Sequence, residues 1–509
     1  MEIIIEKGEA FWGMRAADGT RMPFAEQQFH ISLHKNNSDT NQASNQANPM
    51  LISSHGRWFW SDREFDATIT PDKIIIENNT APIQSGIEAN LKQAFHTLSR
   101  RFFPPVGKLP HKELFANPQY NTWVEFQINQ NQAGILDYAR NIIRNGFPAG
   151  VLMIDDSWQE NFGVLNFHPA RFPDPKAMVA ELHELGFQVV IWITPFISPD
   201  SVPFRQLQKR GLLVTMPSGD PLLSRWWNGY SALLDLTNPE AVDWLRQELN
   251  RMMTEYGVDG FKFDAGHPAH LNPEAVLHTP ATPQEYNARY VDLASEYLLN
   301  ECKSCYQHAG WGIACRQGDK RHTWDNQHGI GALIPNAIAQ GLMGYACNCP
   351  DMIGGGLVSS LGSDLTYDEE LFVRTAQASA LFPMMQFSTA PWRVLSPNGV
   401  ALCREAALLH QRFAPYILQL AEEYTKTCAP ILRCMEYEFP GCGYQTIVDQ
   451  FMLGSEILVA PVLEKGARTR TVVFPEGSWR GPDGTLYEGG QTRTVPAPLD
   501  VLPYFSRVR

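Results

Sequence analysis

The chain has 509 residues, 44% of them hydrophobic and 11% aromatic, which is enough to bury a large core divided over roughly two or three domains. A formal net charge of -13 without any lysine- or arginine-rich run argues against nucleic acid and anionic membranes as the main partners. Neutral small molecules are the expected ligands.

The opening segment, MEIIIEKGEAFWGM, lacks the basic region, long apolar stretch and cleavage site of a secretory signal. We therefore expect a cytoplasmic protein without a membrane partner, and homo-oligomers are left open. The nine cysteines are an odd number spread over a long chain, which indicates reduced thiols. Cys302 and Cys305 lack the second ligand pair that zinc needs, so neither a metal nor another cofactor is expected.

Residues 1–115 contain short β-like segments separated by turn residues, among them GRWFWSD, FDATITP and KIIIENN. This pattern predicts an N-terminal β-sandwich. A polar tract at 36–49 has almost nothing to bury and is expected to be a loop.

From residue 116 apolar strands alternate with amphipathic helices, which is the pattern of βαβ units and a parallel sheet. Eight such units in about 320 residues favour an α/β fold, a closed (β/α)₈ barrel over 116–440. Residues 441–509 are strand-and-turn sequence and predict a small C-terminal β-domain. The predicted barrel strands lie within 121–127, 150–158, 188–196, 257–266, 312–319, 344–349, 380–388 and 428–439.

Polar residues at the C-terminal ends of barrel strands line the active site of such folds. These ends carry carboxylates, basic groups and tryptophan, but no clustered metal ligands, which suggests chemistry on a sugar. Glycoside hydrolysis needs two carboxyl groups. The candidate residues are Asp155, Asp156, Trp192, Trp227, Lys262, Asp264, Arg316, Asp319 and Asp351.

Asp264 is the better nucleophile candidate, because Lys262 lies two residues earlier on the same strand face and would keep the carboxylate ionised. Asp319 is the acid/base candidate. The alternatives are an ion pair at the barrel rim for Asp264 and Lys262, and an exposed loop charge for Asp319, with Asp325 competing for its role.

The other candidates also have structural alternatives. Asp155 or Asp156 could cap a helix, Trp192 and Trp227 could be core residues, and Arg316 could form a rim salt bridge. Two other functional classes stay open: a catalytically silent carbohydrate-binding protein, which would lack one carboxylate, and a metal-dependent hydrolase, which would show histidines clustered at strand ends.

At these residues the chain resembles glycoside hydrolase family 31, the retaining α-glycosidases. The motifs that carry the likeness are FGVLNFHPARFPDP, WITPFISP, GFKFDAG and DQFMLGSEILVAPVLEKGARTRTVVFPEG, and their order matches the family's. The resemblance implies that Asp264 is the nucleophile and Asp319 the acid/base. It also implies sugar contacts in the subsite of the cleaved residue by Asp155, Trp192, Trp227, Lys262 and Arg316.

Further motifs, including WWNGYSALLDLTNPEAVDW and LIPNAIAQGLMGY, are most similar to the branch that contains the myogenesis-regulating glycosidase, an α-galactosidase-type branch. The implied activity is exo-acting α-galactoside hydrolysis, with α-glucosidase, α-xylosidase or transglycosylase as alternatives. A sulfoquinovosidase is disfavoured because DDSWQENFG has no arginine for a sulfonate.

Three positions depart from the family pattern. The segment CRQGDKRHTW replaces the usual Trp-x-Gly-Asp-Asn around the acid/base. The histidine that α-glucosidase branches carry after strand seven is missing, with Gln386 in its neighbourhood. His267 stands where the branch often has glutamate, which predicts a different outer pocket.

Overall fold

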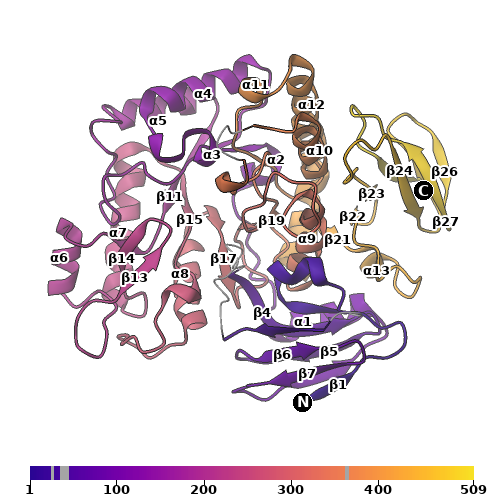
Figure 1. Ribbon diagram of the computed structural model, residues 1–509, viewed down its shortest axis with the longest axis horizontal. Helices are drawn as coiled ribbons and strands as arrows, with labels where there is room; N and C mark the ends of the chain where they lie inside the picture. Colours follow the sequence, from indigo (N-terminus) through magenta and orange to yellow (C-terminus); the bar gives the residue numbers. More distant parts are fainter. Residues whose placement is uncertain (25–27, 35–44, 362–365, 509) are drawn as a thin grey trace.

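The computed structural model describes residues 1–24, 28–34, 45–361 and 366–508. A pair of N-terminal sheets, a barrel and a C-terminal β-domain lie side by side (Figure 1). The three-part organisation predicted from the sequence is therefore present, while the boundaries at 115 and 440 stay a prediction.

Two N-terminal sheets share one hydrophobic core with the barrel. In the described residues, the first sheet has the order β1 (Glu2–Ile4), β7 (Lys73–Glu77), β6 (Asp66–Ile69) and β3 (Phe29–Ser32). The second has the order β17 (Ser304–Tyr306), β4 (Asn45–Ser53), β5 (Arg57–Trp60) and β8 (Gln84–Ile87), with β2 (Phe11–Arg15) also pairing with β4. Next to these sheets lie the short helix η1 (Ala16–Arg21) and the helix α1 (Leu91–Phe102).

The loop expected at 36–49 lies mostly outside the described residues, but its last part is a strand. Residues 45–49 open β4, which pairs with β2, β5 and β17. The polarity of this stretch has a structural cause, because the amide of Asn48 donates to the carbonyl of Met343 in the barrel at 3.0 Å. A polar strand that bonds to a neighbouring domain looks like a loop in sequence.

The barrel is a sheet of parallel strands that closes on itself. In chain order its strands in the described residues are β9 (Gln119–Asn121), β10 (Val151–Ile154), β11 (Gln188–Ile193), β15 (Gly260–Phe263), β16 (Leu299–Cys302), β18 (Cys315–Arg316), β19 (Asn348–Cys349) and β20 (Gln386–Phe387). A parallel bridge between Ile353 and Phe387 joins the β19 segment to β20, and the Ile353 N–H donates to the Gln386 carbonyl at 2.8 Å. The predicted (β/α)₈ barrel is confirmed.

Three predictions about the barrel strands need correction. The fifth strand is β16, which the sequence pattern missed because its apolar residues follow directly on those of a helix. The segment 428–439 is instead β21 (Leu432–Arg433) and the short helix α13 (Met435–Glu438), and β21 pairs with the C-terminal domain. Within 121–127, most residues form the short helix α3 (Trp123–Phe126), and the strand β9 ends at Asn121.

Helices surround the barrel strands (Figure 1). The main ones are α4 (Gln132–Arg144), α5 (Pro175–Glu184), α7 (Pro239–Tyr256), α8 (Pro283–Ala294), α9 (Leu333–Leu342), α10 (Glu369–Ser379) and α12 (Pro397–Thr427). Many begin at a side chain that accepts a backbone N–H, as Asp174 does for α5 and Thr282 for α8. No helix in the described ranges has both the length and the apolar character needed to cross a bilayer.

The connection between β16 and β18 departs from the strand–helix–strand rhythm. It carries β17, which leaves the barrel and pairs in parallel with β4 of the N-terminal sheet. Lys303 is the single residue between β16 and β17. The chain around Lys303 is therefore held by strands on both sides.

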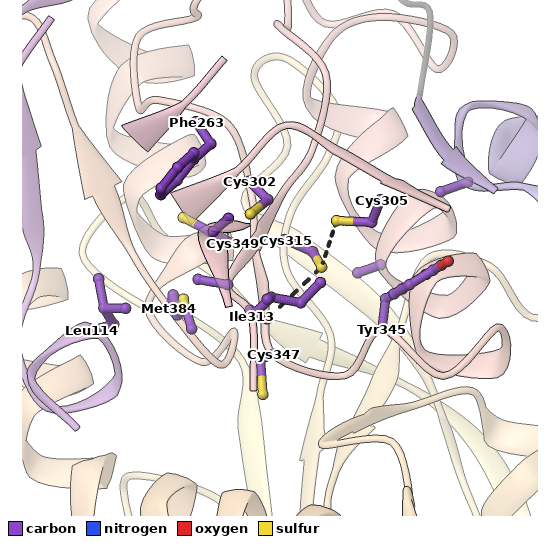
Figure 2. Close-up of a cluster of buried hydrophobic side chains, with 14 of the residues drawn as sticks. Leu114, Phe263, Cys302, Cys305, Ile313, Cys315, Tyr345, Cys347, Cys349 and Met384 are labelled. Carbon is purple, nitrogen blue, oxygen red and sulfur yellow. Dashed lines mark hydrogen bonds between the residues drawn. The ribbon is translucent and has the colours of Figure 1, made fainter. Parts of the chain in front are cut away.

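The core beside this connection is rich in thiols (Figure 2). All nine cysteine positions are described, and each is a free thiol, with only Cys442 exposed. Cys305 and Cys315 approach each other at 3.3 Å between their sulfur atoms. Burial raises the pKa of the Cys305 thiol well above its usual value, so Cys305 stays protonated and packs as a small apolar side chain.

The C-terminal domain packs on the barrel beside α10 and α12 (Figure 1). Among described residues its larger sheet has the order β21, β22 (Phe451–Leu453), β23 (Ile457–Val459), β28 (Tyr504–Val508), β25 (Ser478–Arg480) and β26 (Leu486–Glu488), and β24 (Thr469–Phe474) pairs with β27 (Gln491–Pro496). Arg374 of α10 is buried and donates to the carbonyls of Ala497 at 2.7 Å and Val501 at 3.0 Å. This side chain fixes the domain to the barrel.

Gly260, at the start of β15, leaves no room for a side chain. A Cβ there would overlap the Leu299 carbonyl oxygen of the neighbouring strand and lie 2.7 Å from the Leu299 Cβ. We expect Gly260→Ala to lower the free energy of unfolding by about 2 kcal/mol or more, because two backbone strands must separate. Urea denaturation would measure the loss. Gly481→Ala is the control, since the tightest contact of its Cβ would be with the flexible end of Asp483 at 3.1 Å, and an equal loss in both variants would contradict the explanation.

Candidate active site

The candidate residues converge at the carboxyl end of the barrel strands. Asp155 and Asp156 follow β10, Asp264 follows β15, and Asp351 follows β19. Lys262 and Arg316 lie within β15 and β18. All of these side chains are buried, and ion pairs join most of them into one network.

Asp264 is a buried carboxylate of this network with donors or cations beside both of its oxygens. Its Oδ2 accepts the indole N–H of Trp192 at 3.0 Å and lies 3.7 Å from Lys262 Nζ. Its Oδ1 accepts the Ala265 N–H at 2.7 Å and lies 3.9 Å from Lys303 Nζ. These donors fix the orientation of the carboxylate and favour its ionised form.

Lys303 joins the two candidate catalytic carboxylates. Its ammonium lies 3.9 Å from Asp264 Oδ1 and donates to Asp319 Oδ2 at 3.2 Å. Asp264 Oδ1 and Asp319 Oδ2 can therefore be no farther apart than the sum of these two distances. Asp319 is the less enclosed of the two, with 20% of its side chain exposed. Both carboxylates therefore face one ammonium group.

Lys262 lies beneath this pair and binds a third carboxylate. Its ammonium donates to Asp155 Oδ2 at 2.6 Å. The Asp155 N–H in turn donates to the hydroxyl of Thr122 at 2.9 Å. The sequence left open an ion pair between Lys262 and Asp264 at the barrel rim. The structure places this contact inside a buried network, where at 3.7 Å it is longer than the contact between Lys262 and Asp155.

Arg316 connects the site to the interior of the barrel. Its Nη1 donates to Asp319 Oδ1 at 3.0 Å and to Asp351 Oδ1 at 2.6 Å, and its Nε donates to Glu301 Oε1 at 3.2 Å. Arg316 is buried, so its ion pairs are shielded from solvent. Asp351 Oδ2 accepts the backbone N–H groups of Lys320 and Gly356, and both oxygens of this carboxylate are therefore bound by protein donors.

The pKa values of the two candidate catalytic carboxyls are shifted in the same direction. Burial by itself raises the pKa of Asp264, but Lys303 and Lys262 outweigh it and hold this pKa well below its usual range. For Asp319, burial likewise raises the pKa, and Lys303 and Arg316 lower it further than burial raises it. Without a ligand, both groups are carboxylates at neutral pH.

Asp156 behaves differently, because its side chain bonds a neutral amide and not one of the cations of the network. Burial raises its pKa to about 6, although a hydrogen bond from the Asn228 side chain at 2.6 Å lowers it. The residue after it, Ser157, has a left-handed backbone with φ of 72°, which is costly for a residue other than glycine. Asp156 can therefore change its protonation near neutral pH.

The two candidate tryptophans have different environments. Trp192 is fully buried, bonds Asp264 and stacks on Trp226 with 6.4 Å between ring centroids. Trp227 is 48% exposed and lies at the tip of the hairpin formed by β13 (Leu223–Trp226) and β14 (Gly229–Leu233). The Lys303 ammonium lies 5.7 Å from the Trp227 ring centroid. Trp227 thus lies at the surface beside the ammonium that contacts both carboxylates.

Several structural alternatives from the sequence do not apply. Residues 157–174 after the Asp155–Asp156 pair form turns and bends, so neither aspartate caps a helix there. Asp325 is exposed, and its Oδ1 accepts the N–H groups of Gln327, His328 and Gly329. It stabilises a loop and does not join the network.

Two residues of the network, Lys303 and Glu301, were not among those predicted from the sequence. Both belong to β16 or its end, the strand that was not recognised. Glu301 is buried and accepts from Arg316 and from the Gln386 amide at 2.7 Å. The segment LNECKS held the available signal. Its charged residues Glu301 and Lys303 are two positions apart, as Lys262 and Asp264 are at the end of β15.

In the described residues, one group of acidic and histidine side chains could bring metal ligands together, Glu6, Glu9 and His55. It belongs to the N-terminal region, and Glu9 already pairs with Arg57. The histidines near the barrel site do not form such a group in the described ranges.

The model of the glycosyl hydrolases family 31 TIM-barrel domain matches residues 118–420, and that of the glycosyl hydrolase family 31 C-terminal domain matches residues 428–508. The chain belongs to glycosyl hydrolase family 31. The resemblance inferred from the motifs is thereby confirmed. The match also agrees with the pairing of β21 in the C-terminal sheet of this family 31 protein.

The chain aligns with only part of each of two relatives. Myogenesis-regulating glycosidase of Mus musculus is 34% identical over 417 residues, 80% of this chain and 58% of that protein. The SITS-binding protein of Tetronarce californica is 30% identical over 333 residues, 62% of this chain and 47% of that protein. The chain thus spans about half the length of these curated relatives.

A solved structure supports the family 31 fold. A dextranase of Flavobacterium johnsoniae, complexed with glucose, superposes with a TM-score of 0.85 at 21% identity, covering 100% of this chain and 66% of that chain. At this identity the likeness shows the fold alone.

Asp156 gives a prediction on stability and pH. Its folded-state pKa of about 6 lies above the unfolded value of about 3.9, so the folded state binds the proton more tightly and stability falls as pH rises from about 4 to about 6. An asparagine side chain cannot ionise. We expect Asp156→Asn to gain about 2 kcal/mol relative to the wild type between pH 4 and pH 7, since each pKa unit corresponds to about 1.36 kcal/mol and the unfolded aspartate is already partly ionised at pH 4.

Urea denaturation at both pH values would measure this gain. Asp200→Asn is the control, because the Asp200 side chain is 90% exposed and its replacement should not change the pH dependence. A stability difference between Asp156→Asn and the wild type that stays constant from pH 4 to pH 7 would contradict the raised pKa.

Proposed function

We propose that this family 31 chain is a retaining, exo-acting α-glycoside hydrolase, most specifically an α-galactosidase. The observation that carries the proposal is the arrangement of Asp264 and Asp319 on either side of the Lys303 ammonium, 3.9 Å and 3.2 Å from it. Retaining glycosidases place their carboxyl groups about 5–5.5 Å apart, which this arrangement permits. Location in the cytoplasm and assembly into a homo-oligomer stay predictions.

Asp264 has the environment of a nucleophile. It is ionised and held by Trp192 Nε1 and Ala265 N–H, so little reorganisation precedes its attack on the anomeric carbon. The attack forms a bond from a carboxylate oxygen to the anomeric carbon and breaks the bond to the leaving oxygen. Asp319 gives that oxygen a proton, then removes a proton from water, which releases the sugar with retained configuration.

Asp319 must become protonated before it can act as an acid, and its lowered pKa opposes this. Of the cations beside it, Arg316 is fixed by Glu301 and Asp351, while the Lys303 side chain is flexible in its four-carbon stem. A sugar hydroxyl that draws the Lys303 ammonium away from Asp319 would raise the pKa of this carboxyl. Substrate binding would thus prepare the acid.

The remaining network residues divide into two roles. Asp155, Trp192, Trp227 and Lys262 are proposed to bind the sugar of the cleaved subsite beside Asp264, with Asp156 next to them. Arg316 pairs with Asp319 and Asp351, and both oxygens of Asp351 are bound by protein donors. These two residues are proposed to position Asp319.

The preference for galactose rests on motif similarity and on Gln386, which stands near the position of a histidine in α-glucosidase branches. α-Glucosidase, α-xylosidase and transglycosylase activities are the alternatives of the same chemistry. A silent carbohydrate-binding protein is less well supported, because both carboxylates are present and ionised. Aryl α-glycosides of galactose, glucose and xylose would decide between them, and a higher kcat/KM on another sugar than on galactose would refute the galactose preference.

Removal of either catalytic carboxylate should abolish most activity. We expect Asp264→Asn and Asp319→Asn each to lower kcat on the best aryl glycoside by about 10²–10⁴-fold. Asp137→Asn, on the exposed face of α4, is the control and should stay within about threefold of the wild type. Losses below about tenfold in either active-site variant would refute its role. Proton NMR of the first sugar anomer released would test retention independently.

Lys303 should set the pH range of the activity. Because its ammonium lowers the pKa of both Asp264 and Asp319, Lys303→Met should raise both values and move the profile of kcat/KM against pH to higher pH. Lys209→Met, exposed on α6 (Val202–Lys209), is the control and should leave the profile in place. A profile that keeps its position in Lys303→Met would show that other groups govern it.

A further inference from the structure

The loop after Asp264 has an unusual backbone that fixes the position of His267. Ala265 and Gly266 are both left-handed, with φ of 57° and 64°, and such a conformation costs an alanine roughly 1–2 kcal/mol. A Cβ on Gly266 would lie 3.0 Å from Pro195 Cγ, and the Gly266 carbonyl accepts the Asn287 amide at 3.0 Å. The surroundings thus enforce this loop geometry.

The next residue, His267, is 8% exposed and directly precedes the short helix η3 (Pro268–His270). Its Nε2 has no hydrogen-bond partner within the part of the chain that the structure describes. This atom lies 4.0 Å from Asp264 Oδ1, the oxygen that also faces Lys303. An unpartnered buried nitrogen costs about 1–3 kcal/mol, and here it lies beside the proposed nucleophile.

The neighbours of His267 keep the ring neutral. Its ring stacks on His270 with 5.0 Å between centroids and lies 6.1 Å from the Trp227 ring. Burial, then His270 and Lys303, lower the pKa of His267 well below its usual range. A neutral imidazole nitrogen suits a hydroxyl group, which can donate a hydrogen bond to the nitrogen or accept one from it.

We propose that His267 is a substrate-binding residue whose Nε2 bonds the hydroxyl on carbon two of the cleaved sugar. The inference rests on the proposed function. In the covalent intermediate, Asp264 is bonded to carbon one, and the hydroxyl on carbon two is the nearest polar substituent to that bond. A group 4.0 Å from the nucleophile oxygen is placed to reach this hydroxyl, whereas the hydroxyl on carbon four lies on the far side of the sugar ring.

The test compares an aryl α-galactoside with its 2-deoxy analogue in three variants. His267→Leu should lower kcat/KM on the parent substrate by about 10- to 100-fold, and on the 2-deoxy analogue by less than about threefold, because that analogue has no hydroxyl to lose. His267→Gln, which keeps a polar amide near the same place, should recover most of the parent activity. His270→Leu, the matched control, should affect both substrates equally.

Equal losses on both substrates in His267→Leu, or a selective loss in His270→Leu, would overturn the proposal. Thermal melts would show whether the variants fold. If His267→Leu does not fold, the comparison of the two substrates is made with His267→Gln. If the wild type cleaves a glucoside or xyloside but no galactoside, the galactose preference falls, and the same comparison is made with that sugar and its 2-deoxy analogue. If no aryl glycoside is cleaved, both proposals fall.

Discussion

The structure depends on one buried set of charges. Lys262, Lys303 and Arg316 lie among the carboxylates of Asp155, Asp264, Glu301, Asp319 and Asp351. Removing charges from water is costly unless each finds a partner, so the strands that carry them must meet in one register. The barrel supplies that register, because neighbouring parallel strands place their inward side chains in layers.

The same requirement explains why the barrel interior is polar. The amide of Gln386 donates to Glu301 at 2.7 Å and to Gln119 at 3.0 Å, where barrels of this type usually hold branched apolar residues. Glu301 needs these donors, since it lies at the bottom of the charged network with Arg316 above it. Hydrogen bonds in the centre of the barrel are therefore connected to the charged network at its mouth.

Much of this architecture follows from sequence pattern, and the exceptions have physical causes. The strands before Asp155, Lys262 and Asp264 are apolar runs between turn residues, so their charged ends were visible. The strand β16 was not, because the apolar end of α8 merges with it, and Lys303 and Glu301 were lost with it. The distances among Asp264, Lys303 and Asp319, and the position of the His267 nitrogen, arise from contacts between strands that no local pattern records.

The strand β17 has a consequence for how the parts of this protein can be separated. Gln46 of β4 donates through its amide to the carbonyls of Lys303 and Arg316, so the N-terminal sheet holds the backbone under two residues of the network. A barrel excised without that sheet would leave an open strand edge beside the proposed active site. Chimaeras between family members should therefore exchange residues 1–115 together with the segment from β16 to β18, as one inherited unit.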